Sequence, residues 1–241
     1  MIGCECATCR SDDPRDRRLR PSLLIRASDG TSLLVDAGPD LRAQALTHGI
    51  NRVDAIIFTH GHADHILGLD DVRRYNSLMK RPMRLYGDAL TLDEIKRMFG
   101  YAFDANTPKG GGIPQLELIE VQGPVTVGPL HVTPVPIWHG KRQILGLRLG
   151  RFAYLTDCSG IPDESWGLLA GVEVVVLDAL RHKPHSTHFS LAQAIDASRR
   201  IAARQTYFTH MCHDLPHAAT NAQLPADMAL AYDGQQLNIA D

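Results

Sequence analysis

The chain has 241 residues, of which 44% are hydrophobic, and this is enough apolar material for one sizeable core. A formal net charge of -2 gives no global positive field, which argues against long nucleic acid as a partner. No apolar run approaches the roughly 20 residues of a transmembrane helix and no leader peptide is visible, so we expect no membrane association, a cytoplasmic location and a single domain over residues 1–241.

Three cysteines stand close together at the N-terminus, in the segment 3–9. Cys4, Cys6 and Cys9 form a C-x-C-x-x-C pattern, and the chain has five cysteines in all, an odd number that argues against a disulfide framework. Three thiolates can supply three corners of a tetrahedral zinc site. The fourth ligand must come from a distant part of the chain, and the candidates are Cys212 and His213.

The first regular structure expected is a β-hairpin. Two apolar segments, residues 22–26 and 32–36, flank Asp29 and Gly30, and Asp-Gly between apolar runs is a strong hairpin signal. Asp36 closes the second strand, where it could simply cap a turn.

The stretch T-H-G-H-A-D-H is the densest group of metal-ligating residue types in the chain. It contains His60, His62, Asp64 and His65, directly after a short apolar run at residues 55–58 that is typical of a buried strand. Neutral imidazole and carboxylate suit zinc, manganese, iron or nickel. Because the ligands lie on a strand-to-helix turn, one turn could supply two metals; ordinary surface histidines are a poor explanation for this density.

The remaining pattern alternates strands and helices, which predicts an α/β fold. Thr91 and Ser190 are suited to begin helices as N-caps, and a last hairpin turn is expected at residues 233–234, before a strand at 237–239. The expected strands are residues 83–87, 116–121, 125–127, 130–137, 144–149, 152–156, 174–178 and 206–209, and the expected helices are residues 40–48, 91–99, 164–169 and 190–203.

Several further candidate residues follow these strands or precede a helix. His139 and His210 each end a strand, and Asp157 with Cys158 follows another, so either of the latter two could be the ligand. His188 lies just before a predicted helix. Alone, each of these histidines would be read as an ordinary structural or exposed residue.

Together these motifs resemble the metallo-β-lactamase superfamily. The N-terminal cysteines, H-x-H-x-D-H, the later His and Asp residues and the T-H-F-S sequence around His188 are most similar to PhnP-type cyclic phosphodiesterases, with PqqB proteins and ribonuclease Z as relatives. The resemblance implies a four-layer αββα sandwich. Since such proteins usually begin with a β-strand and a Gly-rich turn, it also implies that the usual first β-strand is missing here.

The resemblance further implies a role for each candidate. Asp36 braces a ligand, and His188 is the general acid, with His185 as the reserve candidate. Two divalent metal ions, zinc or manganese, are implied: one held by His60, His62 and His139, the other by Asp64, His65 and His210, with Asp157 bridging them. A structural zinc is implied at Cys4, Cys6, Cys9 and His213.

The implied function is a binuclear hydrolase that attacks small, cyclic phosphodiesters with a hydroxide held between the two metals. The alternatives are a PqqB-like role in cofactor biosynthesis and a ribonuclease Z-like nuclease. The expected partner is a small phosphodiester substrate, and a homodimer is compatible with this function.

Overall fold

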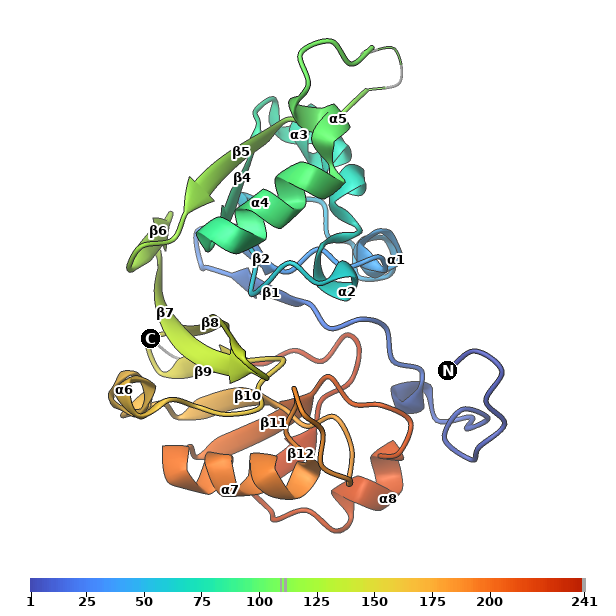
Figure 1. Ribbon diagram of the computed structural model, residues 1–241. Coiled ribbons are helices and arrows are strands. Elements are labelled where there is room, and N and C mark those ends of the chain that lie inside the picture. Colours follow the sequence, from blue (N-terminus) through green and yellow to red (C-terminus); the bar gives the residue numbers. More distant parts are fainter. Residues whose placement is uncertain (109, 111, 240–241) are drawn as a thin grey trace. The chain divides into compact units, whose positions relative to one another are not determined.

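The computed structural model describes residues 1–108, 110 and 112–239. The chain divides into two compact units, here called the central unit (Arg20–Val132) and the terminal unit (Met1–Leu19 with Thr133–Asp241). The strands form two sheets (Figure 1), and each unit has its own hydrophobic cluster. Within the described residues, no helix is both long enough and apolar enough to cross a membrane.

The central unit is built on a five-stranded mixed sheet. The first two strands form the predicted antiparallel hairpin, while the other neighbours pair in parallel. The short strand that precedes the histidine-rich turn is completely buried, as its apolar sequence predicts. The strand order is β1 (Leu23–Arg26), β2 (Ser32–Val35), β3 (Ala55–Ile57), β4 (Met83–Gly87) and β5 (Leu116–Glu120).

One predicted helix boundary in the central unit is wrong. Thr91 does not cap the helix; Asp88 does, because its backbone is extended and its carboxylate accepts a hydrogen bond from the backbone N–H of Thr91 at 2.6 Å. The helix therefore starts earlier than predicted. The helices of this unit are α1 (Leu41–Thr47), α2 (Ala63–Ile66), η2 (Leu69–Val72), α3 (Arg73–Met79), α4 (Ala89–Met98) and α5 (Gly100–Phe103).

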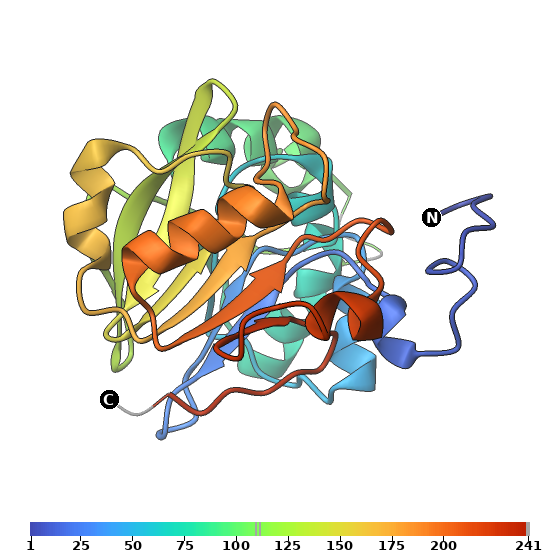
Figure 2. The same cartoon turned by 90° about the horizontal axis from the view of Figure 1, so that it is seen from below.

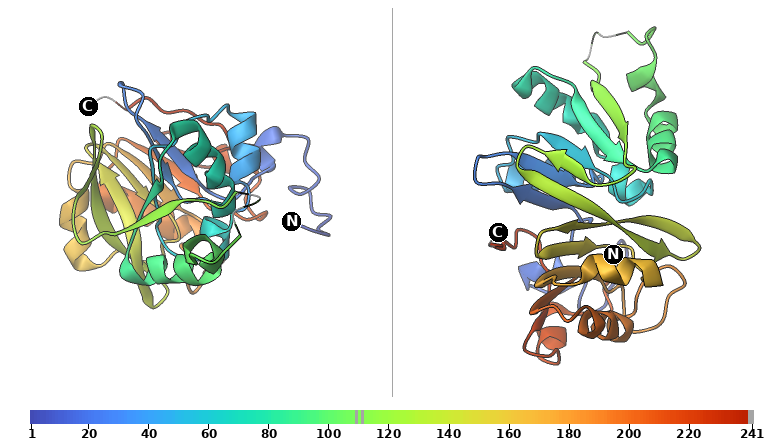
Figure 3. Two further views of the ribbon diagram at one scale, coloured as in Figure 1. Left: turned by 90° about the horizontal axis from the view of Figure 1, so that it is seen from above. Right: turned by 90° about the vertical axis from the view of Figure 1, so that its left-hand side faces the viewer.

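The second sheet has seven strands and is also mixed. Its first four strands are parallel, whereas β9, β8, β7 and β6 pair antiparallel, with β7 and β8 forming a long hairpin (Figure 3). The boundary between the units falls inside β7. The order is β12 (Met228–Leu230), β11 (Gln205–Thr209), β10 (Val174–Asp178), β9 (Phe152–Leu155), β8 (Arg142–Leu149), β7 (Leu130–His139) and β6 (Val125–Val127).

The main helix of the terminal unit, α7 (Leu191–Ile201), packs on β10 (Figure 2). Ser190 and Gln193 form a capping box at its start, so Ser190 is the predicted N-cap. The apolar stripe Leu191, Ala194, Ala197 and Ile201 faces the core. The smaller helices are η1 (Pro14–Asp16), α6 (Asp163–Trp166), η3 (Gly167–Leu169) and α8 (His217–Asn221).

Near the C-terminus the sequence prediction is partly wrong. Residues 237–239 do not form a strand, and the last strand is instead β12, whose three residues lie before the turn at residues 233–234. Helix α8 was not predicted either, because it is short and lacks a polar N-cap. The α/β class with two mixed sheets is confirmed, while the four-layer stacking and the missing first strand stay predictions.

Candidate metal centres

The predicted strand-to-helix turn brings three imidazoles together in the central unit. His60 follows β3 and is fully buried, and its ring centroid lies 4.4 Å from that of His62 and 4.3 Å from that of His65. Asp64 is in the first turn of α2, with its Oδ2 atom 3.9 Å from His65 Nε2. The four residues of this turn that are expected to bind metal therefore converge within this unit.

Asp36 orients two of these imidazoles from beneath the turn. Its Oδ2 atom lies 2.7 Å from His65 Nδ1 and accepts a hydrogen bond from the Thr59 hydroxyl at 2.8 Å. Because the Thr59 proton is used in this way, its Oγ1 atom accepts from His60 Nδ1 at 3.1 Å. Both imidazoles thus have Nδ1 tied to the protein, which leaves Nε2 as the nitrogen suited to bind a metal.

Two glycines allow the Asp36 loop to approach the ligand turn closely. A Cβ atom at Gly38 would lie 2.3 Å from the backbone oxygen of Asp64, and one at Gly68 would lie 2.0 Å from the backbone oxygen of Gly38. The backbone N–H of Ala37 donates to the carbonyl of His65 at 2.7 Å. Any larger side chain at these two glycines would displace the ligand turn.

The terminal unit has a second cluster of imidazoles and carboxylates at the ends of its strands. The ring of His188 stacks on His210 with centroids 4.8 Å apart and meets His139 edge-on at 4.9 Å. Asp157 Oδ1 lies 3.1 Å from His210 Nε2. Asp157, His188 and His210 each offer a ligand atom, and these atoms lie within 4.8 Å of one another.

In this cluster too, two imidazoles, those of His139 and His188, have Nδ1 facing a protein oxygen. His139 Nδ1 donates to the carbonyl oxygen of Thr187 at 2.8 Å, and His188 Nδ1 lies 2.9 Å from Asp178 Oδ2. Asp178 is fully buried, and burial raises its pKa although backbone N–H groups act in the opposite direction. Because Asp178 fixes the tautomer of His188, the Nε2 atom of His188 is directed away from this carboxylate.

Sequence reasoning missed Asp178. It ends β10, which lies between β9 and β11 in a parallel arrangement, and these neighbours are followed by Asp157 and His210. Parallel strands end at the same edge of a sheet, so the polar residue at the end of β10 was a sequence signal that Asp178 lies near Asp157 and His210.

The backbone at three strand ends has an uncommon conformation. Asp36, Asp157 and His210 have φ values of 61°, 56° and 59°, in the left-handed region that side chains other than glycine rarely adopt. Lys80 and Ala202, the other non-glycine residues with positive φ among those described, are C-caps of helices, where this conformation is common. Strained residues persist where the fold fixes them, and they cluster at functional sites.

The structure distinguishes Asp157 from its neighbour Cys158. The Cys158 side chain is fully buried and its thiol donates to the carbonyl of Gly160 at 3.4 Å. Burial raises the pKa of Cys158 well above its ordinary value, which keeps the thiol protonated. The Asp157 carboxylate, in contrast, lies against His210.

The N-terminal cysteines meet His213 in the terminal unit. His213 Nδ1 lies 3.2 Å from Cys4 Sγ, 3.4 Å from Cys6 Sγ and 3.6 Å from Cys9 Sγ. With Zn–S and Zn–N bonds of about 2.3 and 2.0–2.1 Å, a tetrahedral site requires S···N separations of about 3.5 Å. The donor set and its spacing therefore fit a zinc ion held by four protein ligands.

Cys212 does not face these thiols in the same way. Its Sγ atom accepts a hydrogen bond from the backbone N–H of Asp214 at 3.4 Å, while its carbonyl accepts from Arg18 at 2.9 Å. Arg18 also donates to the carbonyl of Leu215 at 2.5 Å, which fixes the N-terminal segment against this loop. Of the two candidates for the fourth ligand, His213 is the one that the structure places with the cysteines.

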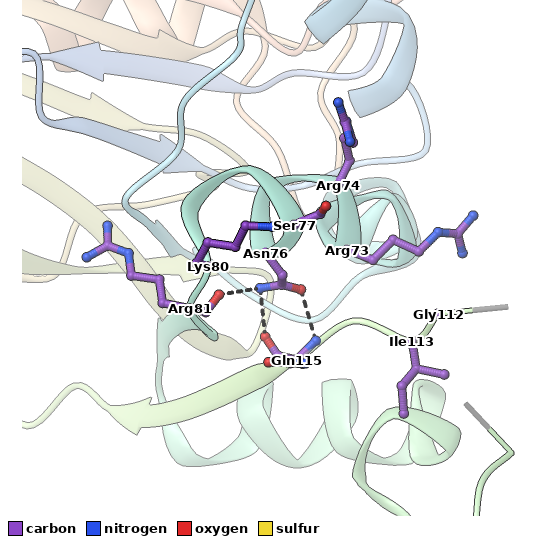
Figure 4. Close-up of a pocket in the computed structure, with 9 residues that line it drawn as sticks. All are labelled: Arg73, Arg74, Asn76, Ser77, Lys80, Arg81, Gly112, Ile113 and Gln115. Carbon is purple, nitrogen blue, oxygen red and sulfur yellow. Dashed lines mark hydrogen bonds between the residues drawn. The ribbon is translucent and has the colours of Figure 1, made fainter. Parts of the chain in front are cut away.

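The central unit also has a pocket of about 560 Å³ between α3 and the segment before β5, and none of the candidate metal ligands lines it. Its cationic side chains diverge, as Figure 4 shows for Arg73, Arg74 and Arg81. Arg73 pairs with Asp70 and Arg81 pairs with Asp54, so these two charges are already compensated. The pocket does not present converging groups to one ligand.

Comparison with known proteins agrees with this geometry. A family model described as a beta-lactamase superfamily domain matches residues 31–211. The crystal structure of a diphosphatase from the PhnP family is 45% identical, with a TM-score of 0.92, and the match covers 99% of this chain and 92% of that one.

Two curated relatives bear different names. An octanoyltransferase from Porphyromonas gingivalis is 38% identical over 97% of this chain, but the chain spans only 47% of its length. A ribonuclease Z from Mycolicibacterium gilvum is 46% identical, and the match covers 82% of this chain and 79% of the relative.

Proposed function

Because the chain belongs to the metallo-β-lactamase superfamily, we propose that it is a metal-dependent hydrolase that breaks a phosphorus–oxygen bond in a small phosphodiester or diphosphate. The observation that carries this proposal is the tethering of the imidazoles. Nδ1 of His60, His65, His139 and His188 each lies within hydrogen-bonding distance of a protein oxygen. Such outer partners are typical of imidazoles that bind a metal or transfer a proton through Nε2.

The ligand assignment in this proposal follows the superfamily pattern. His60, His62 and His139 would hold one metal ion, Asp64, His65 and His210 would hold the other, and Asp157 would be the ligand shared by both. A carboxylate has two oxygens and can contact two cations, whereas a thiolate would favour softer metals. When bound, two divalent ions acidify the attacking water and offset the negative charge that develops on the phosphoryl group.

The protein's own groups then orient the substrate and move the proton. His188 in its imidazolium form donates its Nε2 proton to the departing oxygen, while its Nδ1–H stays bonded to Asp178. Asp36 and Thr59 hold the ligand turn of the central unit, so that its imidazoles need little rearrangement when substrate binds.

Two substrate classes fit this proposal. The sequence motifs favour a cyclic phosphodiester, whereas the similar protein of known structure is a diphosphatase, which acts on a phosphoanhydride. Both reactions place charge on a phosphoryl group and its departing oxygen, so the same site suits either class. A ribonuclease Z-like activity is the second candidate, because a ribonuclease Z is 46% identical to this chain.

The proposal is tested by assaying the purified, metal-loaded protein on matched substrates. We would measure initial rates with bis(p-nitrophenyl) phosphate, 2′,3′-cyclic AMP, ADP-ribose, a precursor transfer RNA and nitrocefin, each with and without EDTA. We expect EDTA-sensitive hydrolysis of at least one of the first three compounds and none of nitrocefin. Cleavage of the transfer RNA alone would favour the ribonuclease, and no hydrolysis by fully metallated protein would contradict the proposal.

A further inference from the structure

His185 belongs to the imidazole cluster of the terminal unit, but the mechanism above gives it no role. Its ring centroid lies 5.2 Å from that of His188, the proposed proton donor, and the side chain is half-buried. A side chain this close to the departing oxygen can contact the part of the substrate that leaves.

The hydrogen bonds of His185 define which of its nitrogens carries a proton. The backbone N–H of Thr187 lies 3.3 Å from His185 Nδ1, and the Thr187 hydroxyl lies 3.1 Å from the same atom. A backbone N–H can only donate, so Nδ1 is the acceptor and Nε2 carries the proton in the neutral ring. His185 therefore offers an Nε2–H donor. In His188 the Nδ1 atom instead faces the Asp178 carboxylate, so Nδ1 accepts a hydrogen bond in His185 but donates one in His188.

The turn that holds His185 is fixed by its own contacts. The Arg181 guanidinium donates to the carbonyls of Lys183 at 3.2 Å and Pro184 at 3.0 Å. Backbone hydrogen bonds close its base, with Leu191 N–H donating to the carbonyl of Arg181 at 2.9 Å. These bonds give the turn a defined conformation without a ligand.

The hairpin turn after β7 packs directly against this turn. Gly140 has φ 63°, and a Cβ atom there would lie 2.8 Å from the Thr187 methyl group. His139, next to this glycine, donates to the Thr187 carbonyl. Glycine is required at this point by both its backbone conformation and the close approach, and Lys141 follows at the hairpin turn.

The two segments that meet here contain basic residues and no acidic ones. Residues 121–156 and 179–195 contain no Asp or Glu, and Asp157 and Asp178, which flank them, are buried against His210 and His188. Near the contact they supply exposed lysines at Lys141 and Lys183. A concentration of one charge sign at a local surface attracts an anionic group of the opposite sign, even on a chain with a net charge of -2.

We propose that His185 Nε2–H, together with Lys183 and Lys141, binds the departing phosphate of a diphosphate substrate. This inference rests on the proposed hydrolase function and adds its substrate class.

In the reaction, the water oxygen bonds to one phosphorus and the bond from that phosphorus to the bridging oxygen breaks. The electron pair stays on the bridging oxygen, which leaves with the second phosphoryl group; one water hydrogen remains on the first phosphate and the other passes to the second phosphate or to solvent. A neutral leaving alcohol would not use this subsite.

Binding of non-hydrolysable probes tests the subsite separately from catalysis. Calorimetry would compare methylenediphosphonate with methylphosphonate for the metal-loaded wild type, His185→Leu, His185→Gln and Lys183→Ala, with the metal content of each protein measured before and after titration. The control is Arg199→Ala, which removes an exposed cation from the last turn of α7, the helix that begins just after this turn.

We expect His185→Leu and Lys183→Ala to weaken methylenediphosphonate binding about tenfold, the effect of losing one charge-assisted hydrogen bond. Binding of methylphosphonate should stay within about twofold, as should both probes with Arg199→Ala. His185→Gln retains an amide donor and should recover part of the affinity.

The subsite would be overturned if, at unchanged metal content, His185→Leu and Lys183→Ala lost affinity equally for both probes. It would also be overturned if they lost no affinity for methylenediphosphonate. Turnover then separates this result from a failure of the proposed function. If His185→Leu hydrolyses bis(p-nitrophenyl) phosphate normally but shows no selective loss on ADP-ribose, the hydrolase stands and the subsite is wrong. If no substrate is hydrolysed but the selective loss of diphosphonate affinity is present, the subsite stands and the hydrolase is wrong.

Discussion

The terminal unit contains two groups of metal-ligating side chains, and they are supported in different ways. Cys4, Cys6 and Cys9 lie on an irregular N-terminal segment that has neither a strand nor an α-helix to hold it. Asp157 and His210, by contrast, lie within two residues of the ends of β9 and β11, and their backbones are in the left-handed region. The cysteine group thus lacks the support of regular secondary structure, whereas the other group is arranged by the ends of the strands.

This difference indicates two uses of a metal ion. A site with four protein ligands leaves no open position, and its binding free energy adds to the free energy of folding. Imidazoles whose Nδ1 atoms are held by outer partners keep their geometry ready for substrate. Loss of the metal bound by the cysteines should therefore affect mainly stability, whereas loss of a metal bound by the imidazoles should affect mainly turnover.

The largest expected effect on turnover is at Asp157. Asp157→Ala removes the proposed bridging ligand, so kcat/KM on bis(p-nitrophenyl) phosphate should fall by more than the roughly 10- to 100-fold that loss of an outer partner costs. Thermal stability should change less than turnover. The control is Cys158→Ser, which should keep the metals and most of the turnover, and the reverse result for the two variants would mean that Cys158 is the ligand.

The next largest effect is expected at His188. His188→Asn retains a donor for Asp178 but removes the acidic proton, so both active-site metals should stay while turnover of 2′,3′-cyclic AMP falls about 10²- to 10⁴-fold. The loss should be smaller on bis(p-nitrophenyl) phosphate, because nitrophenolate leaves without a proton. His182→Ala, an exposed histidine in the same turn, is the control. Loss of metal from His188→Asn would make this residue a ligand instead.

Substitution in the cysteine group should lower stability rather than turnover. Cys6→Ser should lose the structural zinc and lower Tm by roughly 5–10 °C, while turnover well below Tm stays near that of the wild type. Cys212→Ser is the matched control, since this thiol lies in the same loop as His213 but does not face the cysteines. If Cys212→Ser lost the zinc and Cys6→Ser did not, the assignment of His213 would be wrong.

A smaller effect should come from His217, which follows the same loop. Burial, with the nearby Arg15 and Arg18, lowers the pKa of His217 below its ordinary value of 6.5. The unfolded chain therefore binds more protons than the folded one between these two pKa values, and the contribution to stability is complete above 6.5 and is lost as pH falls through this window.

Thermal melting between pH 7.5 and 5.5 measures this contribution. The decrease in Tm on acidification should be less steep in His217→Gln than in the wild type. Measuring both in a Cys6→Ser background removes the part of the pH dependence that comes from zinc release. Identical slopes in that background would show that His217 does not contribute.

Local patterns predicted much of this molecule. The hairpin at Asp29 and Gly30 and the start of α7 at Ser190 are confirmed because each depends on a few adjacent residues. The helix predicted from Thr91 begins earlier because Asp88 competes for the same cap. The pairing of Asp178 with His188 could not be read from spacing, since it requires the parallel register of β10 and the closure of the turn between them.

The separation of the two kinds of metal site is tested most directly by the metal-to-protein ratio, measured by mass spectrometry on the wild type, Cys6→Ser and Asp157→Ala. We predict three metal ions per chain in the wild type. Cys6→Ser should lose one zinc and keep the other two ions, whereas Asp157→Ala should keep that zinc and lose at least one of the others. Loss of all metals from Cys6→Ser, or loss of the thiolate-bound zinc from Asp157→Ala, would contradict the view that the fold arranges the imidazole ligands independently of the cysteine site.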